Sequence, residues 1–164
     1  MPHAAPLVLH RATVLPEWVD YNGHMNEAYY VLVFGHATDA FLDYIGMDDA
    51  ARRATGSSVY TLEAHINYLA EDHQGDHLAI ATQLLAHDAK RLHLHHVMQR
   101  EADGAMLAAI ELMLLHVDMS GPRAFWPRDG GLRRRDRGRS CRPAEAPACR
   151  SRHRPPLRSC TDRT

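Results

Sequence analysis

The chain has 164 residues, of which 45% are hydrophobic and 24% charged, and its formal net charge is −1. That length fits one domain with a buried core. No run approaches the roughly 20 apolar residues of a membrane span, which argues against a membrane-spanning protein. The first six residues lack a charged leader followed by an apolar stretch, so the sequence predicts a cytoplasmic protein and not a secreted one.

The net charge conceals two different kinds of sequence. Residues 1–120 contain 6 Lys and Arg against 16 Asp and Glu, whereas residues 121–164 contain 13 against 4. All three cysteines lie in the second part, and 12 of the 13 histidines lie in the first. We therefore expect a folded domain over residues 1–120 and a separate basic tail over residues 121–164.

The tail has an arginine cluster at residues 133–139 and too few apolar residues to offset the entropy of ordering, so it is predicted to be disordered. Clustered arginines can bind nucleic acid, but no aromatic or glycine repeat supports that role and no nucleic-acid partner is expected. A weak zinc site is a second alternative, from Cys141, Cys149, Cys160 and His153. We favour a third: the tail resembles the out-of-frame translation of a GC-rich gene, with a frameshift between about residues 121 and 130.

The first predicted element of the domain is a strand over residues 7–14, which Pro16 ends. A helix over residues 26–45 follows, with Asn26 as its N-cap and Gly46 as its stop. Its apolar residues lie on nearly all sides, which is typical of a buried helix. Residues 47–55 read as a short polar helix or a loop.

Four strand-like segments complete the domain, at residues 58–69, 77–86, 91–100 and 106–118, with turn-forming Gly and Asp residues between them. One strand, one apolar helix and four further strands is an α+β pattern. An antiparallel sheet of about five strands wrapped around one long helix would bury the apolar surface of that helix. The open edges of such a sheet favour pairing with a second chain.

The loop from Asp20 to Asn26 carries the most informative chemistry. It places a carboxylate just before a helix N-terminus, where unpaired backbone N–H groups and the positive end of the helix dipole lie. Those groups can stabilise an oxyanion while the carboxylate attacks a carbonyl carbon or directs a water at it. The alternative is structural: Asp20, Asn22 and Asn26 would only satisfy backbone groups, as an Asx-turn and a helix cap.

Residues 20–26 resemble the Asp-x-x-Gly-His-x-Asn signature of the 4-hydroxybenzoyl-CoA thioesterase-like branch of the hotdog-fold superfamily. Over roughly residues 8–119, and most specifically over residues 18–46, the chain is similar to the bacterial thioesterases of carnitine breakdown, which hydrolyse betainyl-CoA. The resemblance implies a hotdog fold and an acyl-CoA thioesterase that uses water as its second substrate, with no metal or redox cofactor. It also implies a homodimer or homotetramer with the active site at the subunit interface.

The resemblance gives each residue of the signature a role. The matching Asp, Asp20 here, acts either as a nucleophile through an acyl-enzyme anhydride or as a general base on water, and both routes stay open. Gly23 lets the backbone approach the thioester or is an ordinary turn glycine. His24 orients the loop or binds the thioester region. The backbone N–H groups of Asn26 and Glu27 are the candidates for an oxyanion hole.

Substrate-binding candidates also lie outside the signature. An aromatic ring such as that of Tyr21 can hold a trimethylammonium group by a cation–π contact. Glu63 would pair with that cation if it faces the cleft, and would be solvated if it faces the sheet exterior. Further aromatic candidates for the cation are Trp18, Tyr29, Tyr30 and Tyr60. Basic candidates for the phosphates of CoA are Lys90 and Arg91, followed by Arg52 and Arg53.

Other interpretations stay open. A hotdog-fold enoyl-CoA hydratase has an Asp-x-Asn-Pro-x-His loop, but here Gly23 replaces the proline and His24 comes one residue early. A non-catalytic acyl-CoA-binding protein would keep the fold without using Asp20. His93 and His95 share a strand face as two metal ligands would, but no third ligand is evident and no metal is expected.

Overall fold

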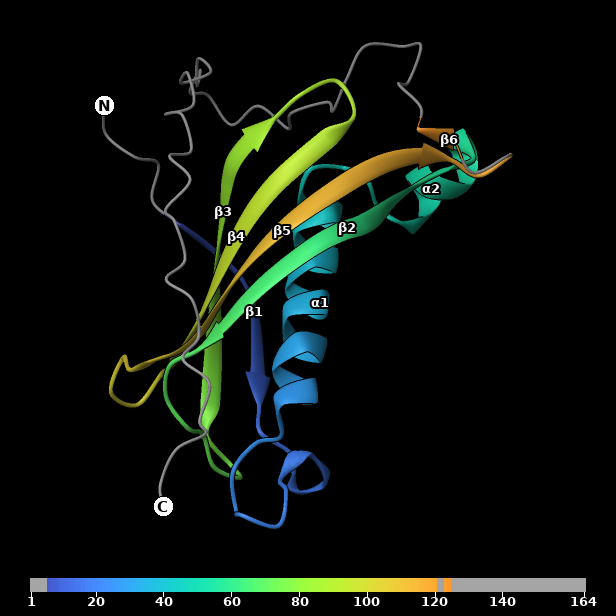
Figure 1. Cartoon of the computed structure of the whole chain (residues 1–164). Helices are drawn as coiled ribbons and strands as arrows, with labels where there is room; N and C mark the ends of the chain where they lie inside the picture. The colour runs from blue at the N-terminus through green and yellow to red at the C-terminus, as the bar shows by residue number, and fades with distance from the viewer. Residues whose placement is uncertain (1–5, 121–122, 125–164) are drawn as a thin grey trace, which may run out of the picture.

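The computed structural model describes residues 6–120 and 123–124, and Figure 1 follows them through the fold. Strand β1 (Leu7–Thr13) is followed by a short 3-10 helix (Pro16–Trp18), the long helix α1 (Glu27–Tyr44) and the short helix α2 (Asp49–Thr55). The strands that follow are β2 (Ser57–Tyr68), β3 (His77–His87), β4 (Arg91–Arg100), β5 (Met106–Asp118) and β6 (Arg123–Ala124). The predicted long helix and five long strands are all present, with ends within one residue of the prediction.

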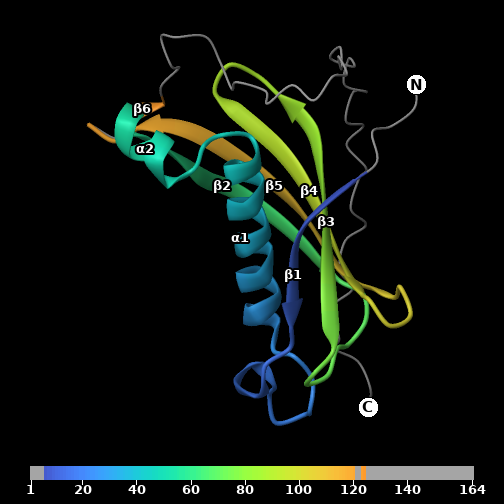
Figure 2. The same cartoon turned by 180° about the vertical axis from the view of Figure 1, so that it is seen from behind.

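The five long strands form one antiparallel sheet in the order β1-β3-β4-β5-β2, and β6 pairs with the end of β5. Helix α1 lies along one face of this sheet, and the curved strands wrap around it, as Figures 1 and 2 show from opposite sides. The chain crosses from β1 to β2 through α1, which places these two strands at opposite edges of the sheet. This confirms the predicted α+β fold.

The core forms where alternating residues of the strands meet one side of α1. In β4 every second residue is buried, as the two-residue period of a strand requires, namely Leu92, Leu94, His96 and Met98. The buried residues of α1 recur at helical spacing, namely Tyr30, Val33, Phe34, Ala37, Thr38, Phe41 and Leu42. One side of the helix therefore meets the inward-facing residues of the sheet.

The other side of α1 is open in the single chain. Val31 and Leu32 are 49% and 42% exposed, although both are apolar. The helix is apolar on nearly all sides, as the sequence predicts, but this chain's own sheet covers one side. Large apolar side chains of this kind at a helix surface are typical of a face that another chain covers.

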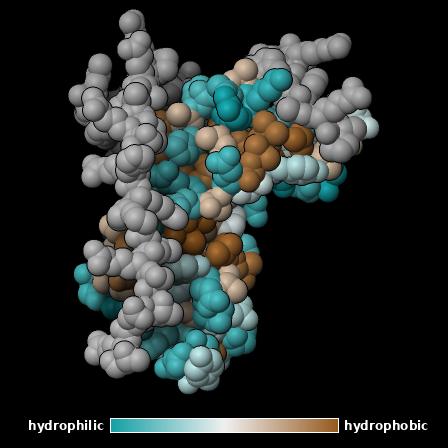
Figure 3. Space-filling model, in the orientation of Figure 1, coloured by the Kyte–Doolittle hydropathy of each residue, from teal (hydrophilic) through white to brown (hydrophobic). Residues whose placement is uncertain are grey.

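Strand β2 is an edge of the sheet, with β5 on one side and, among the described residues, no strand on the other. The register with β5 shifts between Thr61 and Glu63, which marks a β-bulge. Large hydrophobic side chains at or just after this strand are exposed, namely Tyr60, Leu62, Tyr68 and Leu69. Figure 3 shows hydrophobic surface over this part of the sheet. A long open edge with exposed apolar residues favours association.

None of the helices in the described part of the chain is long and apolar enough to cross a bilayer. The expectations for the tail fall on residues 121–164, where only the backbone of residues 123 and 124 is described. Tail disorder, the zinc alternative, the frameshift and the domain boundary near residue 120 therefore stay predictions.

Candidate active site

The loop before α1 is closed at its base against the helix. The Asn26 N–H donates to the Trp18 carbonyl (2.9 Å), and Val19 forms a single antiparallel bridge with Met25. The Asn26 side chain accepts a hydrogen bond from the Ala28 N–H (3.0 Å), which confirms the predicted N-cap. Because these contacts join the loop to the first turn of α1, the loop and the helix N-terminus hold fixed positions relative to each other.

At its tip the loop makes a tight turn. The Gly23 N–H donates to the Asp20 carbonyl (3.0 Å), and the Asp20 N–H donates to the His24 carbonyl (2.9 Å). Gly23 has φ +85°, a conformation that side chains rarely adopt. No atom lies within 4 Å of a Cβ added there, so within one chain Gly23 is needed for the turn and not for a close approach.

The Asp20 carboxylate is half-buried on this turn. Its Oδ1 accepts a hydrogen bond from the Asn22 N–H (2.8 Å), and its Oδ2 lies 3.4 Å from Asn22 Nδ2. This is the Asx-turn of the structural alternative. No Lys, Arg or His among the described residues forms an ion pair with Asp20, so Oδ2 keeps acceptor capacity for water or substrate. The turn contact and a catalytic role are therefore compatible.

The backbone donors at the N-terminus of α1 divide into occupied and free groups. The Asn26 N–H is taken by the Trp18 carbonyl, and the Ala28 N–H by the Asn26 side chain. The Glu27 N–H has no acceptor among the described residues. Of the two expected oxyanion donors, Glu27 is thus the one with a free N–H, while Asn26 acts as the cap.

His24 faces the connection between β2 and β3. Its Nε2 lies 3.2 Å from Oε2 of Glu71, and its ring meets that of His73 edge to face at 5.0 Å. The next residue, Met25, donates its N–H to the Asp72 carbonyl (3.0 Å). These contacts fit the loop-orienting role. No pattern in the sequence predicts this partner segment, because a polar stretch without a period does not indicate which residues it contacts.

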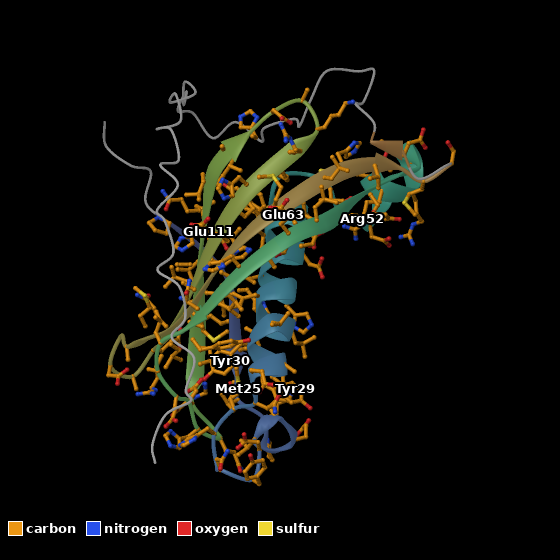
Figure 4. The ribbon with its side chains drawn as sticks, viewed as in Figure 1. Met25, Tyr29, Tyr30, Arg52, Glu63 and Glu111 are labelled. Carbon is orange, nitrogen blue, oxygen red and sulfur yellow. The ribbon has the colours of Figure 1, made fainter. Side chains whose placement is uncertain are left out.

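Aromatic side chains gather near the start of α1, where Figure 4 shows Tyr29 and Tyr30. Trp18 and Tyr29 stack with centroids 5.5 Å apart, and Tyr30 meets Tyr68 edge to face at the same distance. Burial, and less strongly the charge of a nearby Asp, raises the pKa of Tyr30 to about 12, so its hydroxyl stays protonated. Tyr21, beside Asp20, is 96% exposed and is the most exposed of the aromatic candidates.

Glu63 lies on the sheet face opposite α1. It pairs across strands with Met113, which in turn pairs with His93, and cross-strand partners point to the same side. The sequence neighbours of His93 on β4 are buried in the core, so His93 and its partners face outward. Figure 4 shows Glu63 level with the C-terminal half of α1, whereas the loop with Asp20 precedes the N-terminus of that helix. One chain does not bring these two carboxylates together.

The six Lys and Arg side chains of residues 6–120 differ in whether a carboxylate neutralises them. Four form ion pairs, namely Arg11, Arg53, Arg91 and Arg100. Arg52 instead donates from Nη1 to the Met47 carbonyl (2.9 Å), and Lys90 has no carboxylate partner among the described residues. Arg52 and Lys90 are therefore the cations of this part of the chain that keep their charge available for an anionic ligand.

No group of three or more His, Cys, Asp or Glu side chains within the described ranges is arranged to hold a metal ion. His93 Nε2 lies 3.4 Å from Oε2 of Glu111, and His95 is the cross-strand neighbour of the same Glu111 on the outer face of the sheet. This row of polar residues is a cross-strand contact between an imidazole and a carboxylate, with a second imidazole beside it.

Residues 14–149 match the family model described as Thioesterase-like superfamily. The betainyl-CoA thioesterase of Pseudomonas aeruginosa is 51% identical over 118 residues, which cover 72% of this chain and 74% of that protein. The L-carnitine dehydrogenase/betainyl-CoA thioesterase of Agrobacterium fabrum is 53% identical over 118 residues, which cover 72% of this chain and 24% of that longer protein.

Solved structures agree in fold. A putative thioesterase from Pseudomonas putida KT2440 superposes with a TM-score of 0.65 at 45% identity, covering 74% of this chain and 79% of that one. A hypothetical protein from Staphylococcus aureus, solved in complex with CoA, superposes with a TM-score of 0.71 at 27% identity, covering 79% and 82%. The family match, the relatives and the sheet wrapped around one helix show that this chain belongs to the Thioesterase-like superfamily and has its hotdog fold.

Proposed function

We propose that the protein is an acyl-CoA thioesterase that hydrolyses betainyl-CoA to betaine and free CoA, with Asp20 as the catalytic carboxylate. The placement of Asp20 carries the proposal: a carboxylate with free acceptor capacity lies on a tight turn just before a capped helix whose Glu27 N–H is open. The identity of the acyl group rests on the relatives named betainyl-CoA thioesterase, at 51% and 53% identity. Because CoA esters are intracellular metabolites, the proposal places the reaction in the cytoplasm.

Hydrolysis breaks the bond between the carbonyl carbon and sulfur, and water supplies the hydroxyl of the acid and the proton that CoA takes up. In one route Asp20 attacks the carbonyl carbon, CoA leaves as a thiolate, and water then opens the anhydride. In the other, Asp20 takes a proton from a water that attacks directly. Either route makes the carbonyl oxygen negative, and the Glu27 N–H at the positive end of α1 is the donor that we assign to it.

Betaine suits this site because its cation lies close to the reacting carbon. The ammonium nitrogen is two bonds from the carbonyl carbon, so a carboxylate that reaches that carbon is also about 4 Å from a full positive charge. In a partly desolvated site this attraction is on the order of a few kcal/mol, which a neutral acyl group does not gain. The exposed Tyr21 ring beside Asp20 is the cation–π candidate.

The proposal includes a homodimer formed along β2. A two-fold axis perpendicular to the sheet would pair two β2 edges antiparallel and keep both α1 helices on one side. The start of one β2, next to α2, would then lie beside the end of the other, where the Tyr68 hydroxyl donates to the Glu27 carbonyl (3.4 Å). Such pairing would bring Arg52 of the partner subunit toward the site that contains Asp20.

Two cations are assigned to the phosphates of CoA. Arg52 and Lys90 keep their charge free of carboxylates, whereas the other Lys and Arg residues of residues 6–120 are paired. The acidic domain repels a polyanion overall, so such local cations are needed to bind CoA. Glu63, on the outer face, is left without a role in this arrangement.

The test is CoA release from betainyl-CoA, acetyl-CoA and 4-hydroxybenzoyl-CoA by wild type, Asp20→Asn and the control Asp39→Asn. Asp39 is exposed on α1 and outside the site. We expect preference for betainyl-CoA, loss of about 10³-fold in kcat for Asp20→Asn, and no change for Asp39→Asn. Hydration of crotonyl-CoA without CoA release would instead favour the hydratase. A folded wild-type protein that cleaves none of these thioesters would contradict the proposal.

A further inference from the structure

A cluster of acidic and basic side chains around one buried Asp contacts the loop of residues 20–26, called the catalytic loop below, and the reaction itself does not use this cluster. Its centre is Asp72, in the connection between β2 and β3, which is 0% exposed. Arg100, at the end of β4, donates from Nη2 to the Glu71 carbonyl (2.7 Å). Its Nε lies 3.2 Å from Oδ2 of Asp76 and 3.6 Å from Oδ1 of Asp72. These side chains fix the path of the connection at this point.

Three consecutive residues of that connection contact the catalytic loop. The Asp72 carbonyl accepts the Met25 N–H (3.0 Å), and the residues on either side of Asp72 contact His24: Glu71 Oε2 lies 3.2 Å from its Nε2, and the His73 ring meets its ring at 5.0 Å. The His24 carbonyl in turn accepts the Asp20 N–H (2.9 Å). A displacement of residues 71–73 is therefore passed to the turn that carries the catalytic carboxylate.

The surroundings of the Asp72 carboxyl suit its protonated form. Oδ1 accepts the His73 N–H (3.2 Å), while Oδ2 is buried and has no donor among the described residues. An ionised Asp72 would thus leave a charged oxygen buried and unsatisfied, which is costly. A protonated Asp72 can donate to Asp76 instead. Burial, followed by this hydrogen bond and the charge of Asp76, holds the pKa of Asp72 well above its usual range.

Asp76 shows the opposite behaviour, as expected of the acceptor in a shared-proton pair. The hydrogen bond from Asp72 is the largest cause that lowers the pKa of Asp76, and the His73 N–H and Arg100 add to it. Asp76 is 30% exposed through its side chain and keeps its charge against Arg100. The pair is stable with one proton, whereas two negative charges side by side would repel.

We propose that Asp72 is a positioning residue for the thioester hydrolysis: the proton that its carboxyl shares with Asp76 holds residues 71–73 in the arrangement that fixes His24 and the turn carrying Asp20. The inference rests on the proposed function, because it concerns the same site. Loss of the proton adds a buried negative charge next to Asp76, which pushes the segment away from its contacts. Turnover then falls as pH rises through the neutral range, because the catalytic carboxylate is held less firmly.

Other groups that titrate or carry charge lie around Asp72, on the connection itself, the catalytic loop, α1, and the end of β4 with its following turn. Those that interact with Asp72 are His73, Asp76, Tyr30 and Arg100. Asp103 pairs with Arg100, and Glu71 pairs with His24, so these three lie one contact further away. All of them remain in an Asp72→Asn variant. A pH effect that this substitution removes therefore belongs to Asp72 and not to the neighbouring imidazoles.

The experiment measures kcat at saturating betainyl-CoA from about pH 6 to pH 9 for wild type, Asp72→Asn and the matched control Asp39→Asn. We expect wild type and Asp39→Asn to lose about tenfold over the upper half of this range. Asp72→Asn should stay within about threefold of wild type at the acid end and lose the decline, because a neutral amide donates to Asp76 at every pH. A decline in Asp72→Asn equal to that of wild type overturns the proposal.

Asp76→Asn is the second variant, chosen because Asp76 is partly exposed and its replacement disturbs the core least. It removes the negative charge that helps to keep the proton on Asp72, and its amide N–H can donate to an ionised Asp72, so the decline should move to lower pH. If kcat of Asp76→Asn declines at the same pH as kcat of wild type, the shared-proton pair is contradicted.

Hydrogen exchange of the Met25 amide gives a readout without substrate. Corrected for the intrinsic rate, protection of this amide should fall across neutral pH in wild type and stay constant in Asp72→Asn. Inactivity toward every thioester would contradict the proposed function, whereas constant Met25 protection in wild type would contradict this inference. The two failures are thus told apart.

Discussion

Thr38 of α1 and His96 of β4 are joined by a hydrogen bond of 3.1 Å in the centre of the core, where both side chains are buried. The Thr38 hydroxyl donates to the Phe34 carbonyl (3.0 Å), so it accepts from Nε2 of His96. Nδ1 of the same ring then accepts from the Thr82 hydroxyl (2.9 Å). Both ring nitrogens of a neutral imidazole are satisfied in this way. One uncharged histidine therefore ties the helix to two strands.

This arrangement predicts loss of stability in mild acid. Burial, with a smaller effect of His95, lowers the pKa of His96 from 6.5 to about 4. The unfolded chain takes up this proton at higher pH than the folded one does, so the stabilisation is complete above the unfolded pKa and is lost as pH falls toward the folded one. The loss should be on the order of 3 kcal/mol in the free energy of unfolding.

Urea unfolding of wild type and His96→Leu at several pH values checks this prediction. Asp72 acts in the opposite direction, because its raised pKa favours the folded state in acid, and the comparison with His96→Leu cancels that contribution. Any advantage of wild type over His96→Leu at neutral pH should shrink or reverse below the ordinary histidine pKa. Parallel pH dependence of the two proteins would contradict the assignment.

Local patterns in the sequence were sufficient to predict most of the fold. The bounds of β4 and β5 follow from alternation between turn residues, and the start of α1 follows from Asn26 as a cap. The Asx-turn at Asp20 is likewise a contact between residues two apart. Each of these features depends on neighbours in the chain, which is why the sequence predicts them.

The rest of the fold and of the candidate site depends on contacts between residues that are far apart in the sequence. The bulge between Thr61 and Glu63 reverses the alternation of β2, because Thr61 lies opposite core-facing Leu114 but Glu63 opposite outward-facing Met113. An unbroken alternation would have turned Glu63 toward α1. Asp72 and Arg100 come together across 28 positions from two polar segments without period. The contacts that support the loop carrying Asp20 could therefore not be predicted from the sequence.

The charge of the acyl group should decide specificity. The probe is 3,3-dimethylbutanoyl-CoA, which has the shape of betainyl-CoA with carbon in place of the ammonium nitrogen. After division by the rate of uncatalysed hydrolysis, we expect wild type to favour betainyl-CoA in kcat/KM by about 50-fold or more, because Asp20 attracts the cation only in that substrate. Equal normalised values would show that Asp20 does not sense the acyl charge.

Arg52 should contribute to CoA binding and not to chemistry. Arg52→Met is expected to raise KM for betainyl-CoA about tenfold with little change in kcat, since a phosphate contact is made equally in the ground and transition states. The neighbouring Arg53 is paired with Asp49, so Arg53→Met is the matched control and should have little effect. A betainyl thioester of pantetheine lacks the nucleotide phosphates, and its KM should not respond to Arg52→Met. An equal response with both substrates would contradict the assignment.

Residues 121–164 should be dispensable for the fold of the domain. Every core residue of the described part of the chain lies between Val14 and Val117, so a chain ended after residue 124, which retains β6, should unfold at the same urea concentration as the full chain. A large rise or fall in that urea concentration on truncation would show that the tail affects the stability of the domain. Resequencing the 3′ end of the gene tests the frameshift separately. An intact arginine-rich reading frame that close relatives share would contradict that hypothesis.

Two chains should pair along the open edge of β2, and each of the two active sites of this dimer should contain residues of both chains. Leu62 is 54% exposed on this edge, and Leu62→Lys is expected to convert a dimer into a monomer in sedimentation equilibrium, because a charge at such an edge opposes strand pairing. Leu85 is 43% exposed on β3, away from this edge, so Leu85→Lys is the control and should leave the dimer intact. A wild-type monomer, or a dimer that survives Leu62→Lys, would contradict the interface.

Mixing two inactive or weakened variants then tests whether Arg52 acts across the interface. In a hybrid of Asp20→Asn and Arg52→Met chains, one of the two sites combines an intact Asp20 with an intact Arg52 of the partner subunit. If Arg52 acts in trans, exchanging subunits should restore activity at low betainyl-CoA toward that of one wild-type site per dimer, above either variant alone. If Arg52 serves its own chain, every hybrid site is defective and mixing gains nothing, so the same measurement decides which subunit supplies the cation.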